Sequence, residues 1–169
     1  MDREKQKDIL KWMLGRAFRA ENHKKQLKER LARIRQEMDA PYGAIKYDAM
    51  PRSQGNGDGA AALVIKLTEV EEKIVEQMKV VAEAEIRVME IIEYIPIHEV
   101  ARQILELRHI DMMTWYEIAE AIPMSRQQCN RKYKEALDSL LQYPEIRKKV
   151  EKAEPDYDAW ISGRAKPKK

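Results

Sequence analysis

The chain has 169 residues, of which 44% are hydrophobic and 36% are charged, so it can form one or two small domains with an extensive solvated surface. Its formal net charge of +3 is too small to indicate nucleic-acid binding by itself. The single cysteine, Cys129, excludes an internal disulfide and a zinc site built from cysteines.

Residues 1–38 are predicted to form one long N-terminal helix. Small and apolar residues recur there at alternating steps of three and four, with Lys24 as the one polar exception, a spacing typical of a seam between helices. The seam residues are Leu10, Met13, Ala17, Ala20, Leu27, Leu31, Ile34 and Met38. The segment is basic, with twelve Lys and Arg against six Asp and Glu. Either the helix packs within its own domain or it associates with another copy of the chain.

Residues 39–62 are predicted to be a flexible linker, because they contain two prolines and four glycines. A second long helix is predicted over 63–97, where branched apolar residues recur every seven positions from Leu67 to Ile95. Gln77 is a polar residue within its companion seam. Because this helix is acidic and the first is basic, the two could pair within one chain, but oligomerisation through a coiled coil fits the pattern equally well.

Three shorter helices are predicted in a domain over 98–143, at 98–109, 114–121 and 125–141. Thr114 with Glu117, and Ser125 with Gln128, have the spacing of two capping boxes, in which two side chains satisfy the free N–H groups at a helix start. Residues 144–169, which include three prolines and end in a basic run, are predicted to be a C-terminal basic tail. The fold class predicted for the whole chain is all-α.

The helix at 125–141 has two chemically different faces. Its apolar face carries Cys129, Tyr133, Ala136, Leu137 and Leu140. Its other face suits the major groove of duplex DNA, because Arg can pair with guanine, Asn or Gln with adenine, and further cations with phosphates. We therefore identify as candidate DNA-binding residues Ser125, Arg126, Gln127, Asn130, Arg131 and Lys134. The alternative for such a face is simple solvation.

Other kinds of site find little support in the sequence. His23, His98 and His109 lack companions at metal-ligand spacing, and the glycines near residue 57 lack the lysine of a phosphate-binding loop, so we expect no metal, no cofactor and no enzymatic activity. Trp115 is expected to anchor the core, whereas the role of Trp160 stays open. No apolar run at the N-terminus is long enough for a signal peptide, so we expect a soluble cytoplasmic protein with no membrane partner.

Residues 98–140 resemble the region-four helix-turn-helix of bacterial sigma factors. They are more similar still to phage and prophage late-transcription regulators of the ArpU and RinA type. The positions that carry the resemblance are Arg102, Ile104, Leu105, Leu107, Arg108, His109 and Ile110, then Thr114, Trp115, Ile118 and Ala119, then Ser125, Arg126, Gln127 and Gln128, and finally Ala136 and Leu137. Residues 42–97 resemble the same group more weakly, chiefly through the segment YDAMPRS at 47–53.

Three positions depart from the pattern of this group. His109 stands where Tyr is usual, Cys129 where Val is common, and Pro123 where many such motifs have Gly. Cys packs as a small hydrophobic residue, which makes that change mild. Pro cannot adopt the positive φ that Gly permits, so the turn before the second motif helix must close in another way.

The resemblance implies a transcriptional regulator of phage or prophage origin in the cytoplasm of a bacterial host cell. Such a protein would bind double-stranded DNA as a homo-oligomer, a dimer first of all, activate late genes and contact the host RNA polymerase. Two alternatives remain. One is a DNA-packaging subunit like the small terminase, and the other is a protein-protein adaptor that has lost its DNA contact.

Overall fold

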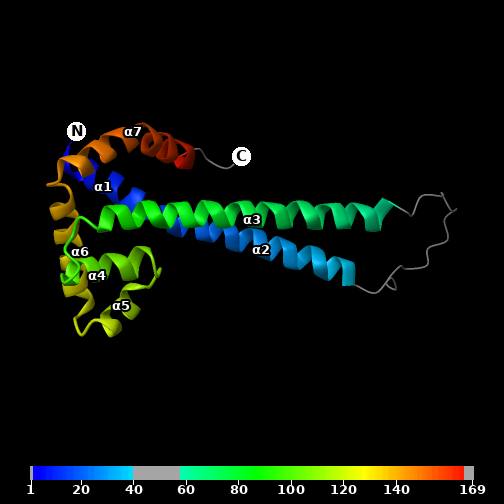
Figure 1. Cartoon of the computed structure of the whole chain (residues 1–169), viewed down its shortest axis with the longest axis horizontal. Coiled ribbons are helices and arrows are strands. Elements are labelled where there is room, and N and C mark those ends of the chain that lie inside the picture. The colour runs from blue at the N-terminus through cyan, green and yellow to red at the C-terminus, as the bar shows by residue number, and fades with distance from the viewer. Residues whose placement is uncertain (1, 40–57, 166–169) are drawn as a thin grey trace. The chain divides into compact units, whose positions relative to one another are not determined.

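The computed structural model describes residues 2–39 and 58–165, and these residues are all-α (Figure 1), which confirms the predicted fold class. The helices are α1 (Arg3–Leu14), α2 (Arg16–Asp39), α3 (Asp58–Ile92), α4 (Val100–His109), α5 (Trp115–Ala121), α6 (Arg126–Leu140) and α7 (Pro144–Ala165). The chain divides into two compact units. One comprises Ala20–Val81, and the other comprises the described residues up to Arg19 and from Ala82 onward.

The unit Ala20–Val81 is an antiparallel pair formed by α2 and the first part of α3 (Figure 1). Leu27 and Ile74 are buried within it. Gln77 Nε2 donates a hydrogen bond of 2.9 Å to the carbonyl of Ala20, so the polar seam residue satisfies a backbone group of the neighbouring helix. Pairing of the two long helices, which the sequence left open, therefore occurs within this chain.

The start of α3 corrects the predicted linker. The helix begins at Asp58, so residues 58–62 belong to it, whereas 40–57 lie outside the described residues. Three consecutive alanines at 60–62 explain the early start, because Ala has the highest helix propensity of all residues. The second long helix also ends at Ile92, a few residues earlier than predicted and ahead of Pro96.

The prediction of one uninterrupted helix over 1–38 is wrong at Gly15, which separates α1 from α2. Gly15 has φ −74° and ψ 4°, and its N–H donates to the carbonyl of Lys11 over 2.9 Å. Glycine has a low helix propensity, so an interruption costs little at this position. A Cβ at residue 15 would lie 3.3 Å from the same carbonyl, which is a tight approach.

The C-terminal segment corrects the prediction of a basic tail, because residues 144–165 form helix α7. Pro144 occupies the first helical position, where a backbone N–H would make no hydrogen bond within the helix, so its absence in proline costs nothing. Ile146, Val150 and Ala153 recur at helical spacing and are buried, and α7 packs along α1. This burial offsets the hydrogen bond that Pro155 forfeits inside the helix. Residues 166–169 lie outside the described part of the chain.

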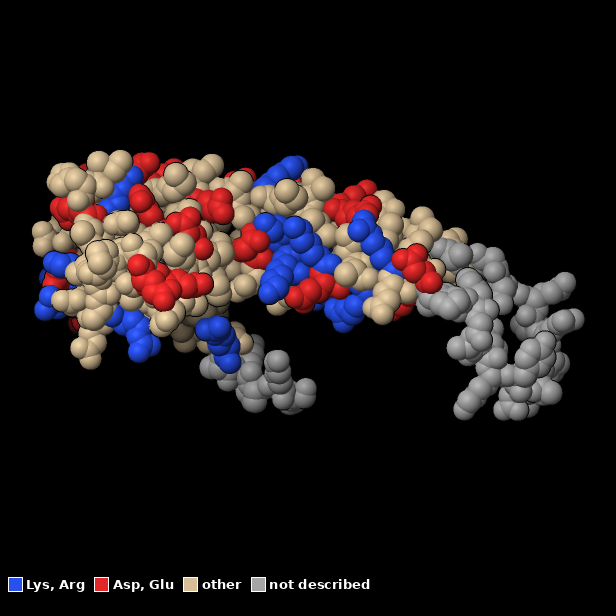
Figure 2. All heavy atoms as spheres, turned by 90° about the horizontal axis from the view of Figure 1, so that it is seen from below, with Lys and Arg blue, Asp and Glu red and all other residues tan. Residues whose placement is uncertain are grey.

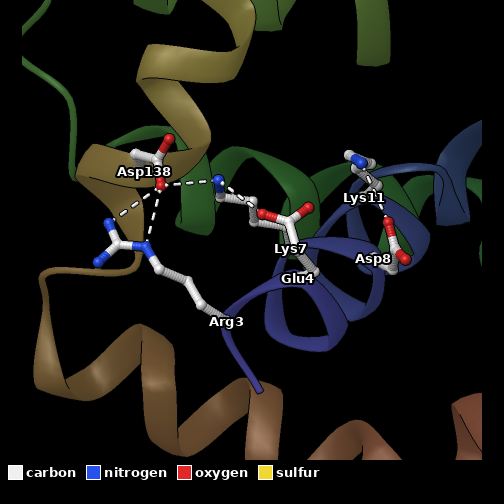
Figure 3. A network of polar contacts seen from close by, with 6 residues as sticks. All are labelled: Arg3, Glu4, Lys7, Asp8, Lys11 and Asp138. Carbon is white, nitrogen blue, oxygen red and sulfur yellow. Dashed lines mark hydrogen bonds and ion pairs between the residues drawn. The ribbon is translucent and has the colours of Figure 1, made fainter. Parts of the chain in front are cut away.

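Ion pairs also hold α1 against its neighbours. Asp138 near the end of α6 pairs with both Arg3 and Lys7 of α1, at 3.0 Å in each case (Figure 3). Hydrogen bonds from Lys7 and then from Arg3 lower the pKa of the Asp138 carboxyl. Lys5 pairs with Glu154 and Asp158 of α7. Such exposed pairs are screened by water and contribute little to stability, so they orient α1 more than they stabilise it.

His109, at the end of α4, is the one polar residue among the buried side chains of the described chain. Its Nε2 lies 3.1 Å from the hydroxyl of Tyr133 on α6. Burial is the main cause that lowers the pKa of His109 to about 4, with the nearby charge of Arg108 as a second cause. Burial also raises the pKa of Tyr133 to about 12, so the hydroxyl keeps its proton beside the neutral imidazole.

Acidification should destabilise the fold through His109. The unfolded chain binds a proton near the ordinary pKa of 6.5, but the folded chain binds it only near pH 4. Between these values the unfolded state holds more protons, so the free energy of unfolding falls as the pH falls, by about 3 kcal/mol over the whole interval. Urea unfolding at a series of pH values measures this slope. His109→Gln should flatten it, whereas His98→Gln, at an exposed position, should leave it unchanged.

Candidate nucleic-acid interface

Helices α4, α5 and α6 pack around a small apolar core. Ile104, Ile118, Ile122 and Cys129 form its centre. Partly buried side chains pack around this centre, namely Leu107, Met113, Trp115, Ala119, Met124 and Tyr133. The predicted inward position of Cys129 is therefore confirmed. Cys129 is fully buried, which fits its packing as a small hydrophobic residue.

Both predicted capping boxes are present. The Thr114 hydroxyl accepts from the Glu117 N–H, and the Glu117 carboxylate accepts from the Thr114 N–H over 2.6 Å. Ser125 and Gln128 repeat this arrangement at the start of α6, with distances of 3.2 and 2.8 Å. These reciprocal hydrogen bonds set the residue at which α5 and α6 begin.

Pro123 shapes the turn between α5 and α6. Ile122 is extended, with φ −109° and ψ 122°, the conformation that a residue before proline prefers. The N–H of Met124 donates to the carbonyl of Ile122, which closes the turn around Pro123. The turn thus needs no residue with positive φ, as expected once proline replaces glycine. Among the described residues positive φ occurs at Met112, in the connection between α4 and α5.

Trp115 is held between α4 and α6. The Arg108 guanidinium lies 5.1 Å from the centre of its ring, and the Tyr133 ring meets it edge-on at 5.3 Å. Arg108 in turn donates to the carbonyl of Met113 over 2.7 Å. These contacts confirm Trp115 as an anchor of the core. Because cation and aromatic contacts already occupy the ring, it is poorly placed to stack on a base.

The outward face of α6 collects the candidate DNA-binding residues on one surface. Arg126, Gln127, Arg131 and Lys134 are exposed, and Asn130 is half-buried. The Asn130 amide donates to the carbonyl of Arg126 over 3.0 Å, so its oxygen remains the free acceptor. The Ser125 hydroxyl belongs to the capping box, which makes this residue a positioning group. A shallow depression lined by Ser125, Gln127, Gln128 and Arg131 opens at the start of the helix.

Glu135 lowers the positive charge of this face. Its carboxylate lies 2.8 Å from Lys132 Nζ and 3.8 Å from Arg131 Nε, and the hydrogen bond from Lys132 is the main cause that lowers its pKa. Arg126 and Lys134 make no ion pair within the described residues. The sequence analysis did not include this pairing of Glu135 with the cations of α6. The spacing of three residues from Lys132 and four from Arg131 indicates it, because side chains at these spacings meet on one face of a helix.

Charges of both signs are interspersed on the face of the protein that Figure 2 shows. In Figure 2 the lysines and arginines alternate with aspartates and glutamates across the face in view, with no dominant basic area. A long-range field therefore cannot carry recognition of a polyanion on this face. On the helix itself, the cations that could meet a nucleic acid are Arg126, Arg131, Lys132 and Lys134.

Comparison with known proteins assigns neither a family nor a function to this chain. No protein-family model matches the chain, and neither the curated proteins nor the solved structures yield a match. Within the described ranges, no three His, Cys, Asp or Glu side chains are grouped so that they could hold a metal ion. None of the described helices is both long and apolar enough to span a bilayer.

Ser125→Ala should destabilise the helix-turn-helix by about 1 kcal/mol, because it leaves the first N–H groups of α6 without a side-chain acceptor. Chemical denaturation followed by tryptophan fluorescence measures the loss. Ser139→Ala, at an exposed position in the last turn of the same helix, is the matched control and should change stability by less than about 0.5 kcal/mol. Equal effects of the two changes would contradict the role of the capping box.

Proposed function

We propose that the protein is a sequence-specific DNA-binding transcriptional regulator that inserts α6 into the major groove of duplex DNA. One observation carries the proposal. The apolar face of α6 is buried against α4 and α5, while its opposite face presents Arg126, Gln127 and Arg131 to solvent in the first two turns. Side chains in these turns of a recognition helix are the ones that reach base edges.

The chemistry of this face divides into two tasks. Gln127 can pair with the edge of a base, as can Asn130 through its free amide oxygen and the N–H that does not bond Arg126, and Arg126 can bond a guanine in a bidentate manner. Arg131 and Lys134 lie farther along α6, where they can neutralise phosphates. Two rigid capping boxes and a proline-closed turn keep α6 in one orientation, so that base contacts need little reordering on binding.

The biological setting rests on the resemblance of residues 98–140 to ArpU-type and RinA-type regulators. It supports a homodimer that activates phage or prophage late genes and contacts the host RNA polymerase. A dimer would place two copies of α6 about one helical turn apart on the DNA, so we expect a target with inverted repeats. Selection from a random duplex library at near-physiological salt tests this directly. Enrichment of a motif supports the proposal, and an unenriched pool from folded protein contradicts it.

Single substitutions on α6 should separate affinity from sequence preference. Arg131→Ala should weaken binding to all duplexes and lower the slope of log affinity against log salt by about 1, because one phosphate contact is lost. Gln127→Ala and Asn130→Ala should change preference at one base position by about 1–3 kcal/mol. Fluorescence anisotropy with the selected duplex measures both effects. Arg147→Ala, an exposed arginine on α7, is the control and should leave binding unchanged.

Glu135→Gln should tighten duplex binding. The change removes a carboxylate that pairs with Lys132 and lies near Arg131, so both cations become free to meet phosphates. We expect a steeper dependence of affinity on salt together with higher affinity at low salt. The same anisotropy titration measures this outcome. Weaker binding by Glu135→Gln would mean that the carboxylate itself receives a hydrogen bond from a base, as acidic side chains do with cytosine.

A further inference from the structure

A second concave site lies away from the α6 face, where the junction of α1 and α2, the end of α3 and the middle of α7 converge. The cleft has a volume of about 340 Å³, which is at the lower end of the range of ligand pockets. Its floor is apolar and consists of the buried side chains Met13, Ile91 and Ala153. The cleft can therefore take an apolar group as well as a charged one.

Its walls carry more positive than negative charge. Arg16, Arg87, Lys149 and Lys152 line the cleft, together with only two carboxylates, Glu90 and Asp156. Lys149 is paired with Glu90 over 3.4 Å. Arg87 approaches only Glu83, outside the cleft, and at the long distance of 3.9 Å. Arg16 and Lys152 form no ion pair within the described part of the chain.

The two arginines repel each other across the cleft. Arg16 is about half-buried, with its guanidinium 5.9 Å from the centre of the Trp12 ring. Burial is the main cause that lowers its pKa, and the positive charge of Arg87 is the second, partly offset by Asp156. An anion placed between the two guanidinium groups would relieve this repulsion at a partly desolvated site, where charge interactions are stronger than in water.

We infer that this cleft docks an acidic segment of a partner protein, with a carboxylate between Arg16 and Arg87 and a neighbouring apolar side chain over Met13 and Ile91. The inference stands apart from the proposed DNA contact, since none of these residues belongs to α6. An acidic peptide fits better than duplex DNA for two reasons. The phosphate backbone offers no apolar group for the floor, and a double helix is too wide to enter a cleft of side-chain size.

Selection from a displayed library of random peptides, with the full chain as bait, tests the inference. We expect the enriched peptides to combine Asp or Glu with a nearby large apolar residue. The double variant Arg16→Gln with Arg87→Gln should bind them about tenfold more weakly or worse. Arg147→Gln with Lys148→Gln removes the same charge from an exposed part of α7 outside the cleft, and should bind them as the unaltered chain does.

A single substitution in the cleft and a parallel measurement of duplex binding distinguish loss of the docking site from misfolding. Lys152→Gln changes one exposed side chain and should still weaken peptide binding severalfold, so misfolding of the double variant cannot account for a loss. Arg131→Ala should leave peptide affinity unchanged, and the cleft variants should leave duplex affinity unchanged. Peptides without acidic residues, an unenriched library, or equal binding by the double variant would overturn the inference. A loss of duplex affinity in the cleft variants would instead assign the cleft to a DNA interface, which also contradicts it.

Discussion

The burial of one face of α6 is the constraint on which the candidate interface depends. Cys129, Ala136, Leu137 and Leu140 are almost fully removed from water. Burying apolar side chains of this size contributes about 1.5–3 kcal/mol for each large one, far more than any exposed contact of the same helix. Since a helix cannot rotate without exposing that stripe, the polar side chains opposite are held toward solvent. The orientation of the candidate DNA-binding face thus follows from packing on its other side.

Polar contacts refine this arrangement at both ends of α6. At its start the capping box satisfies free N–H groups, and at its end Asp138 meets two cations of α1. The buried pair of His109 and Tyr133 joins α4 to the middle of the same helix. A neutral imidazole is required at this position, because burial disfavours its charged form. The packing that presents α6 is therefore also expected to make the domain sensitive to acid.

The charged side chains of α6 act over short distances. The cations of α6 are few, and Glu135 competes for two of them, so recognition of DNA would depend on their geometry more than on a field. The cleft lined by α7 has the opposite character, because neither of its arginines pairs with a carboxylate of the cleft among the described residues and its floor is apolar. Two chemically distinct surfaces of this kind would allow one chain to hold a nucleic acid and a protein at the same time.

The sequence by itself determined the all-α class, the beginning of α6, and the inward and outward faces of α6. These features depend on hydrogen bonds and side-chain spacing within about four residues, so they can be predicted from short stretches of the sequence. Only the tertiary structure decided that 144–165 is a helix, since α7 packs along α1 and the burial of Ile146 and Val150 outweighs the proline at position 155 inside the helix. It also decided that α2 pairs with α3 in the same chain, and that Arg16 and Arg87 share a cleft. Contacts between residues far apart in sequence leave no local pattern from which they could be predicted.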